Sequence, residues 1–225
     1  MKLLIDDANV AKIREISEFY PVDGVTTNPS ILAKSGRPPF EVLREIREVI
    51  GDKELHVQVI SSDCAGMIAE AEKIVSVLGK DTYIKVPVTR EGVKAIKALS
   101  ADGYKITATA IYTPMQAYLA AKAGADYAAP YVNRIDNLGA NGIESAMTIH
   151  DIFVNNGFKT EVLAASFKNS QQVQALAAYG CGCATAAPDI IEGLITNPTV
   201  TAAVEAFKKD FESLVDEGTT MLDYE

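Results

Sequence analysis

The amino-acid sequence predicts an α/β fold, a (β/α)8 TIM barrel with an additional C-terminal helix. Short runs of apolar and β-branched residues alternate with longer segments of helical periodicity, a pattern typical of parallel strands joined by crossover helices. Eight such units fit within the 225 residues, whereas an open doubly wound sheet usually has about five or six strands. No linker-like segment divides the chain, so we expect a single barrel domain over residues 1–225.

The predicted strands are short and apolar, and each is followed by a segment long enough for a crossover helix. Their inner positions should fill the barrel, and their outer positions should pack against the helices. The strands are expected at residues 2–6, 24–27, 55–60, 82–86, 106–111, 127–132, 161–166 and 183–187.

Several connecting segments are amphipathic. Residues 63–78 carry one apolar stripe, and Asp63 stands in the position of an N-cap. Residues 91–99 repeat this pattern. A C-terminal helix at residues 199–216 carries an apolar stripe, including Phe207, that is longer than the barrel requires. We therefore expect this helix to pack on a neighbouring subunit.

The composition excludes several classes of partner. A formal net charge of −9 and the lack of a Lys/Arg run argue against nucleic-acid binding. No segment approaches the roughly 18 to 20 apolar residues of a membrane helix, and the start of the chain does not resemble a signal peptide. A cytoplasmic enzyme that acts on a small molecule is expected.

The cysteines and histidines do not form a metal-binding pattern. Cys64, Cys181 and Cys183 are interpreted as reduced, structural residues. His56 and His150 lie far apart and lack the neighbours of a typical metal site. We expect neither a metal nor an organic cofactor.

Polar residues occupy the carboxyl end of nearly every predicted strand. Such positions interrupt runs that should be wholly apolar, and in barrels of this class the chemistry belongs at this end. We expect their side chains to converge on one mouth of the barrel. They are Asp6, Thr26, Thr27, Asn28, Gln58, Lys85, Thr107, Thr109, Tyr131, Asn133, Arg134 and Ser166.

Lys85 is the most informative of these residues. It stands between Ile84 and Val86 in a predicted buried strand, where a lysine is costly unless it is neutral or paired. One interpretation is a structural ion pair with Asp6. The other is a nucleophile whose pKa is lowered by desolvation to roughly 7 to 8, so that the free amine attacks a ketone. The residues alone leave both open.

The neighbouring polar residues also allow two interpretations each. Asn28 is either a helix N-cap or a ligand for hydroxyl groups. Gln58 and Thr109 are either ordinary polar residues of the barrel layers or part of a site. Tyr131 is either a packed ring with a solvated hydroxyl or an acid/base.

Arg134 and Ser166 indicate an anion site. Ser166 ends the seventh predicted strand, in the region where barrels commonly hold phosphate. Together with Arg134, its hydroxyl could grip a sugar phosphate.

Four separated motifs resemble the short transaldolase and fructose-6-phosphate aldolase family, and the resemblance covers essentially the whole chain. The motifs are GVTTNPS at residues 24–30, KVP at 85–87, APYVNRID at 129–136 and AASFK at 164–168. The resemblance implies a metal-independent class I aldolase in which Lys85 forms a Schiff base. It further implies that Tyr131 is the acid/base, acting with a water held by Gln58 and Thr109. Asp6 and Asn28, with Thr26 beside them, would orient the nucleophile and the substrate hydroxyls, and Arg134 and Ser166 would bind phosphate.

Two positions favour the aldolase within this family. Transaldolases of the family carry glutamate at position 58 and phenylalanine at position 131, whereas Gln58 and Tyr131 resemble the fructose-6-phosphate aldolases. The implied reaction is reversible cleavage of fructose 6-phosphate to dihydroxyacetone and glyceraldehyde 3-phosphate. The alternatives are a transaldolase that transfers a dihydroxyacetone unit between sugar phosphates and a non-catalytic sugar-phosphate-binding barrel.

The resemblance also implies a homo-oligomer of five barrels in a ring, stacked as a decamer. One departure is Thr107, which replaces a bulkier apolar residue of the best-known aldolase and could alter the pocket wall and the donor preference.

Overall fold

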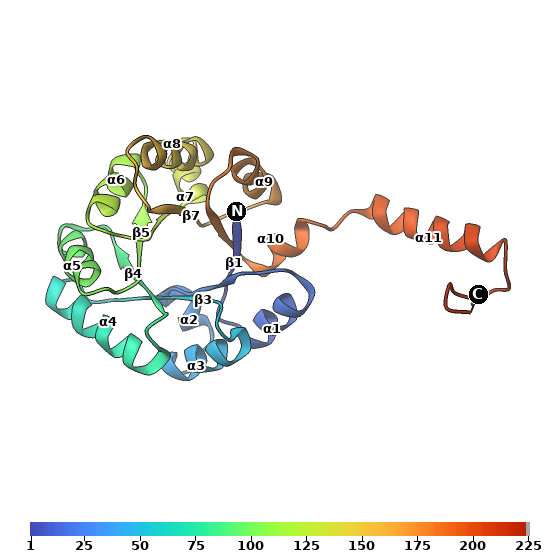
Figure 1. Ribbon diagram of the computed structural model, residues 1–225, viewed down its shortest axis with the longest axis horizontal. Helices are drawn as coiled ribbons and strands as arrows, with labels where there is room; N and C mark the ends of the chain where they lie inside the picture. Colours follow the sequence, from blue (N-terminus) through green and yellow to red (C-terminus); the bar gives the residue numbers. More distant parts are fainter. Residues whose placement is uncertain (224–225) are drawn as a thin grey trace. The chain divides into compact units, whose positions relative to one another are not determined.

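The computed structural model describes residues Met1–Asp223 and contains a closed barrel of eight parallel strands that pair in sequence order (Figure 1). The predicted fold class is therefore confirmed. The strands are β1 (Lys2–Asp6), β2 (Gly24–Thr26), β3 (Glu54–Gln58), β4 (Tyr83–Pro87), β5 (Ile106–Ile111), β6 (Tyr127–Pro130), β7 (Glu161–Ala164) and β8 (Cys183–Ala186).

Several strands end earlier than the sequence predicts, because the chain turns away at the rim. Tyr131 forms only an isolated bridge with Ala165, and α7 begins at the next residue. Ser166 has a φ of 64°, a left-handed conformation that cannot continue a strand. The polar ends of the sixth and seventh predicted strands are thus rim residues.

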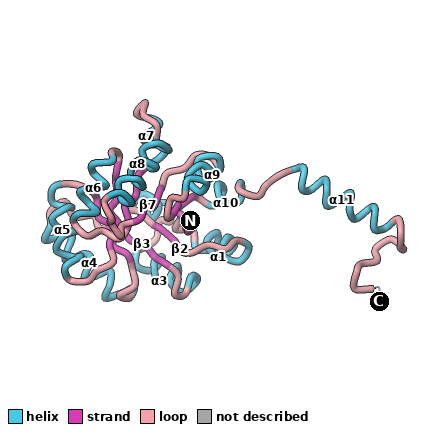
Figure 2. Tube along the Cα trace, turned by 45° about the horizontal axis from the view of Figure 1, so that its top comes forward, coloured by secondary structure: helices cyan, strands magenta, loops and turns pink. Residues whose placement is uncertain are grey.

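Helices surround the barrel, as Figures 1 and 2 show. Asp63 caps α4 as predicted, accepting a hydrogen bond of 2.9 Å from the Gly66 amide. The predicted helix at residues 91–99 is also present and is slightly longer. The helices of the barrel are α1 (Val10–Phe19), α2 (Pro29–Lys34), α3 (Pro39–Ile50), α4 (Cys64–Leu78), α5 (Arg90–Ala101), α6 (Pro114–Lys122), α7 (Val132–Asn137), α8 (Gly142–Asn155), α9 (Ser170–Tyr179) and α10 (Pro188–Gly193).

The core has two parts because side chains alternate across each strand. The outward-facing residues, such as Ile84 and Val86, are fully buried between the barrel and its helices. A smaller cluster, formed by Leu4, Tyr127, Ala129, Leu163 and Cys183, fills the barrel interior. Lys85, between Ile84 and Val86, therefore projects toward the barrel axis.

The chain separates into two compact units, Met1–Ile191 and Glu192–Glu225. The second unit contains α11 (Pro198–Glu212), which ends four residues before the predicted limit at position 216. The single barrel domain predicted for residues 1–225 includes Tyr224 and Glu225, which lie outside the described residues. Within residues 1–223, no helix is long and apolar enough to cross a membrane.

Candidate active site

A cavity of about 270 Å³ opens at the carboxyl ends of the strands and brings together six of the nine predicted site residues. The six come from β1, β4 and the segments that follow β2, β6 and β7, so residues distant in sequence share one site. They are Asp6, Asn28, Lys85, Tyr131, Arg134 and Ser166.

Lys85 lines this cavity and is only 5% exposed. Its Nζ donates a hydrogen bond of 2.8 Å to the Thr27 carbonyl and forms no ion pair with Asp6. Burial lowers the pKa of the Lys85 amine; the Asp6 carboxylate opposes this shift, and the Arg134 charge adds to it. This geometry favours a neutral amine over a structural ion pair.

Asp6 ends β1, and its side chain accepts a hydrogen bond from Thr26, which in turn contacts Thr185. Its Oδ1 accepts a hydrogen bond of 2.8 Å from the Thr26 hydroxyl, which lies 2.7 Å from the Thr185 hydroxyl. Burial raises the pKa of the Asp6 carboxyl, whereas the Lys85 charge and the Thr26 hydrogen bond lower it. Thr26 therefore orients Asp6 from beneath the cavity.

Asn28 supports both interpretations left open by the sequence. Its side chain caps α2 by accepting a hydrogen bond of 3.0 Å from the Ile31 amide, and the residue also lines the cavity. Because Oδ1 serves the cap, the amide nitrogen of Asn28 remains available to a ligand.

Tyr131 and Thr109 form a direct contact, with 2.9 Å between their hydroxyl oxygens. A register shift in β5 between Ala108 and Ile111 accompanies this contact, and Ala110 within the shift has a φ of 58°. The Arg134 guanidinium lies 4.5 Å from the centre of the Tyr131 ring. The phenol is thus fixed by a hydroxyl on one side and by a cation on its face.

Arg134 and Ser166 remain available for an anion. The Ser166 carbonyl accepts a hydrogen bond of 2.8 Å from the Asn133 amide, which joins the start of α7 to the end of β7. Within residues 1–223, neither the Ser166 hydroxyl nor the Arg134 guanidinium has a hydrogen-bond partner. Both groups line the cavity and can donate to phosphate oxygens.

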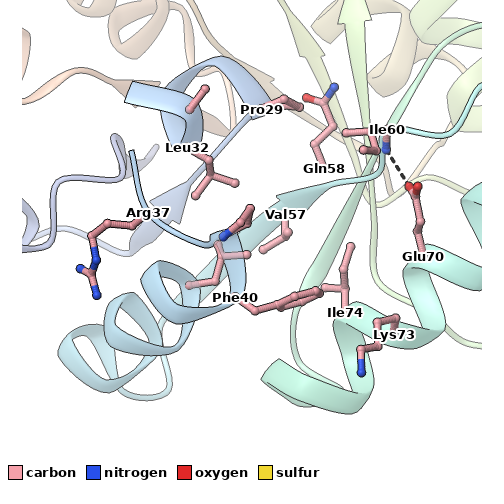
Figure 3. A pocket seen from close by; sticks show the side chains of 13 residues that line it. Pro29, Leu32, Arg37, Phe40, Val57, Gln58, Ile60, Glu70, Lys73 and Ile74 are labelled. Atoms are coloured by element: carbon pink, nitrogen blue, oxygen red, sulfur yellow. Dashed lines mark hydrogen bonds between the residues drawn. The ribbon is translucent and has the colours of Figure 1, made fainter. Parts of the chain in front are cut away.

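Gln58 pairs in register with Lys85, so its side chain leaves β3 on the same face of the sheet as Lys85 leaves β4. The Gln58 stem also borders an adjacent apolar groove of about 410 Å³, but in Figure 3 its amide points away from Phe40 and Ile74. Its Oε1 is buried and has no hydrogen-bond partner among the described residues. The Gln58 Oε1 atom can therefore accept a hydrogen bond from a bound molecule.

Thr107 departs from its expected place. Its hydroxyl lies 2.8 Å from His56 Nδ1, and it is fully buried within the barrel rather than among the cavity-lining residues. His56 stacks on Tyr83, with 4.5 Å between the ring centres, and burial lowers the pKa of His56 to about 4. Thr107 therefore contacts the His56 ring inside the barrel, although it pairs in register with Lys85.

Ser30 and Lys34 of α2 also line the cavity and were missed in the sequence interpretation. The available signal was their spacing, since residues four apart on a helix that begins at the rim share a face. No group of three or more His, Cys, Asp or Glu side chains that could hold a metal ion occurs in the described part of the chain.

Comparisons with known proteins place these residues in a family context. A family model described as Transaldolase/Fructose-6-phosphate aldolase matches residues 3–224. The chain is 42% identical over 214 residues to a "Probable transaldolase" of Geobacter sulfurreducens, covering 95% of this chain and 99% of that protein. It is 43% identical over 216 residues to a "Probable fructose-6-phosphate aldolase" of Streptococcus pneumoniae, covering 94% and 96%.

Proposed function

Since the chain belongs to the transaldolase/fructose-6-phosphate aldolase family, we propose that it is a class I aldolase that reversibly cleaves fructose 6-phosphate to dihydroxyacetone and glyceraldehyde 3-phosphate. The observation that carries this proposal is Lys85, a buried amine with a lowered pKa that lines the cavity. A neutral amine is the form that attacks a carbonyl.

The reaction begins with imine formation. The Lys85 nitrogen attacks C2 of the open-chain ketose, and water leaves to give an iminium. Tyr131, the assigned acid/base, then takes the proton of the C4 hydroxyl, the C3–C4 bond breaks, and its electron pair flows into the iminium to give an enamine. Glyceraldehyde 3-phosphate departs, while the three-carbon enamine remains on Lys85.

Tyr131 supports release of this enamine as dihydroxyacetone. Its hydroxyl, held 2.9 Å from the Thr109 hydroxyl at the cavity wall, is the proton donor we assign to the enamine carbon C3. Protonation restores the iminium, and hydrolysis frees the amine and the ketone. Asp6 and Asn28 orient the nucleophile and the substrate hydroxyls in this proposal.

The principal alternative is a transaldolase, in which the enamine waits for a second sugar phosphate. The names of the relatives do not decide, because both activities appear at about the same identity. The Tyr131 hydroxyl, which a transaldolase-type phenylalanine lacks, favours the aldolase.

Two measurements test the proposal. Incubation with fructose 6-phosphate alone should release free dihydroxyacetone, and borohydride should then trap an adduct on Lys85 that peptide mass mapping locates. Transfer to erythrose 4-phosphate without release of dihydroxyacetone would instead establish the transaldolase. If borohydride traps no adduct on Lys85 with fructose 6-phosphate, in the presence or absence of erythrose 4-phosphate, the Schiff-base mechanism is wrong. A non-catalytic sugar-phosphate-binding barrel then becomes the better explanation.

Assembly into a homo-oligomer is part of the same proposal. Exposed apolar residues on α11 include Val204 and Phe207, at 60% and 69% exposure. An apolar face of this kind is typical of a subunit interface. Light scattering should report an oligomer for the natural chain and a smaller species for a Val204→Asp/Phe207→Asp double variant. A monomer for the natural chain would contradict the assembly.

A further inference from the structure

Lys34 has no evident role in the fold and lies outside the four sequence motifs. It is the last residue of α2 and is exposed. No hydrogen bond or ion pair holds its ammonium group within the described residues. It nevertheless lines the candidate active site, on the same helical face as Ser30 and Ile31.

Among the described residues, no carboxylate forms an ion pair with Lys34. Asp6, the carboxylate of the cavity, is buried and accepts a hydrogen bond from Thr26. Asp7 lines a neighbouring cavity that Lys34 also borders, but its Oδ1 accepts from the Ala8 and Asn9 amides. Lys34 and Arg134 are thus two cations that face one cavity in a protein whose net charge is −9.

The barrel order places these two cations at the ends of one arc of the rim. Arg134 follows β6 and Lys34 follows β2, and the cavity between them is lined by residues at the ends of β7, β8 and β1. Ser166 lies within this arc. A dianionic phosphate bound along this arc would accept hydrogen bonds from the planar Arg134 guanidinium on one side and from the flexible Lys34 ammonium on the other.

We propose that Lys34 determines the specificity for phosphorylated aldehydes, because its ammonium group contacts the substrate phosphate opposite Arg134. The inference rests on the proposed function and names a residue that discriminates among its substrates. Lys34 does not touch the reacting carbons, so its removal should weaken binding of a phosphorylated partner and leave imine formation unchanged.

The test compares Lys34→Ala with Lys34→Arg and a matched control, Lys159→Ala. Lys159 is also exposed, but it precedes β7 at the opposite end of the barrel, so its removal changes the net charge equally. With dihydroxyacetone as donor, kcat/KM is measured for D-glyceraldehyde 3-phosphate and for unphosphorylated D-glyceraldehyde.

Lys34→Ala should lower kcat/KM for the phosphorylated aldehyde by about tenfold, the loss of one charge-assisted contact, and change the value for D-glyceraldehyde less than about twofold. Lys34→Arg should retain most of the preference, and Lys159→Ala should change neither value. The effect of Lys34→Ala should shrink as salt is raised, because exposed charges are screened. Equal losses for both aldehydes, or no loss for the phosphorylated one, would overturn the inference.

The proposed function and this inference fail in different ways. If the natural protein forms no borohydride-trapped adduct with dihydroxyacetone, the proposed function fails. Calorimetric binding of D-glyceraldehyde 3-phosphate still tests Lys34 in that case, since a weaker affinity in Lys34→Ala but not in Lys159→Ala supports the contact. Equal affinities in the two variants reject it.

Discussion

Replacement of Lys85 by methionine tests whether the folded protein holds this amine neutral. Methionine fills a similar volume and cannot bind a proton. Burial lowers the pKa of Lys85 from its ordinary value of 10.5. Between the lowered pKa and 10.5, the unfolded chain therefore binds a proton that the folded chain does not. The free energy of unfolding of the natural protein should rise with pH relative to the Lys85→Met variant.

The magnitude follows from proton linkage. A difference of one bound proton changes the free energy of unfolding by about 1.4 kcal/mol per pH unit. From pH 7.5 to 9.5 the free energy of unfolding of the natural protein should therefore rise, relative to that of Lys85→Met, by up to about 2.7 kcal/mol. The penalty for burying Lys85 disappears above pH 10.5 and grows as the pH falls toward the folded-state pKa.

Urea unfolding at fixed protein concentration, followed by far-UV circular dichroism across this pH range, gives the required difference. The same comparison in an Asp6→Asn background removes the coupled carboxyl, and Lys159→Met provides a surface control. A flat difference for Lys85→Met in both backgrounds would show that folded Lys85 is protonated, and the argument for a neutral nucleophile would fail.

Three further substitutions test the geometry of the site and the fold. Tyr131→Phe should slow release of dihydroxyacetone by about 10² or more, as expected for loss of an acid/base, while borohydride trapping on Lys85 persists; unchanged release would exclude the phenol as the proton donor. Ala110→Gly should raise the free energy of unfolding by about 1 kcal/mol in urea titrations, because glycine accepts the φ of 58° without strain, and a decrease would refute the assignment of strain. Gly92→Ala should lower the melting temperature, because its Cβ would stand 1.9 Å from the Pro87 carbonyl oxygen, and an unchanged melting temperature in calorimetry would show that α5 shifts at little cost.

The barrel could be predicted because its signals are local and repeated. Each strand is a short apolar run, and polar caps such as Asp63 mark where helices begin. Strand ends were predicted less well at β6 and β7. There the chain leaves the sheet through Tyr131 and Ser166, whose backbone conformations depend on contacts between distant segments.

The sequence predicted that the site lies at the strand ends, but not the contacts that each side chain makes there. Lys85 and Asp6 were recognised because charged residues interrupt apolar strands. Gln58 pairs in register with Lys85, but the sequence did not show that its Oε1 is buried without a hydrogen-bond partner among the described residues. Lys34 was missed because a lysine at the end of a helix resembles any solvated surface charge.

Local strain near the cavity indicates that the site was shaped at the expense of stability. Within residues 1–223, the two non-glycine residues with positive φ are Ala110 and Ser166. Ala110 follows Thr109, whose hydroxyl contacts Tyr131, and Ser166 lines the cavity itself. Each such conformation costs about 1 to 3 kcal/mol and persists only when the surrounding structure enforces it. A glycine at position 110 would remove the strain but also free the backbone that fixes Thr109. The stability gain of Ala110→Gly should therefore come with a loss of dihydroxyacetone release, which links the strain to the placement of the Tyr131 hydroxyl.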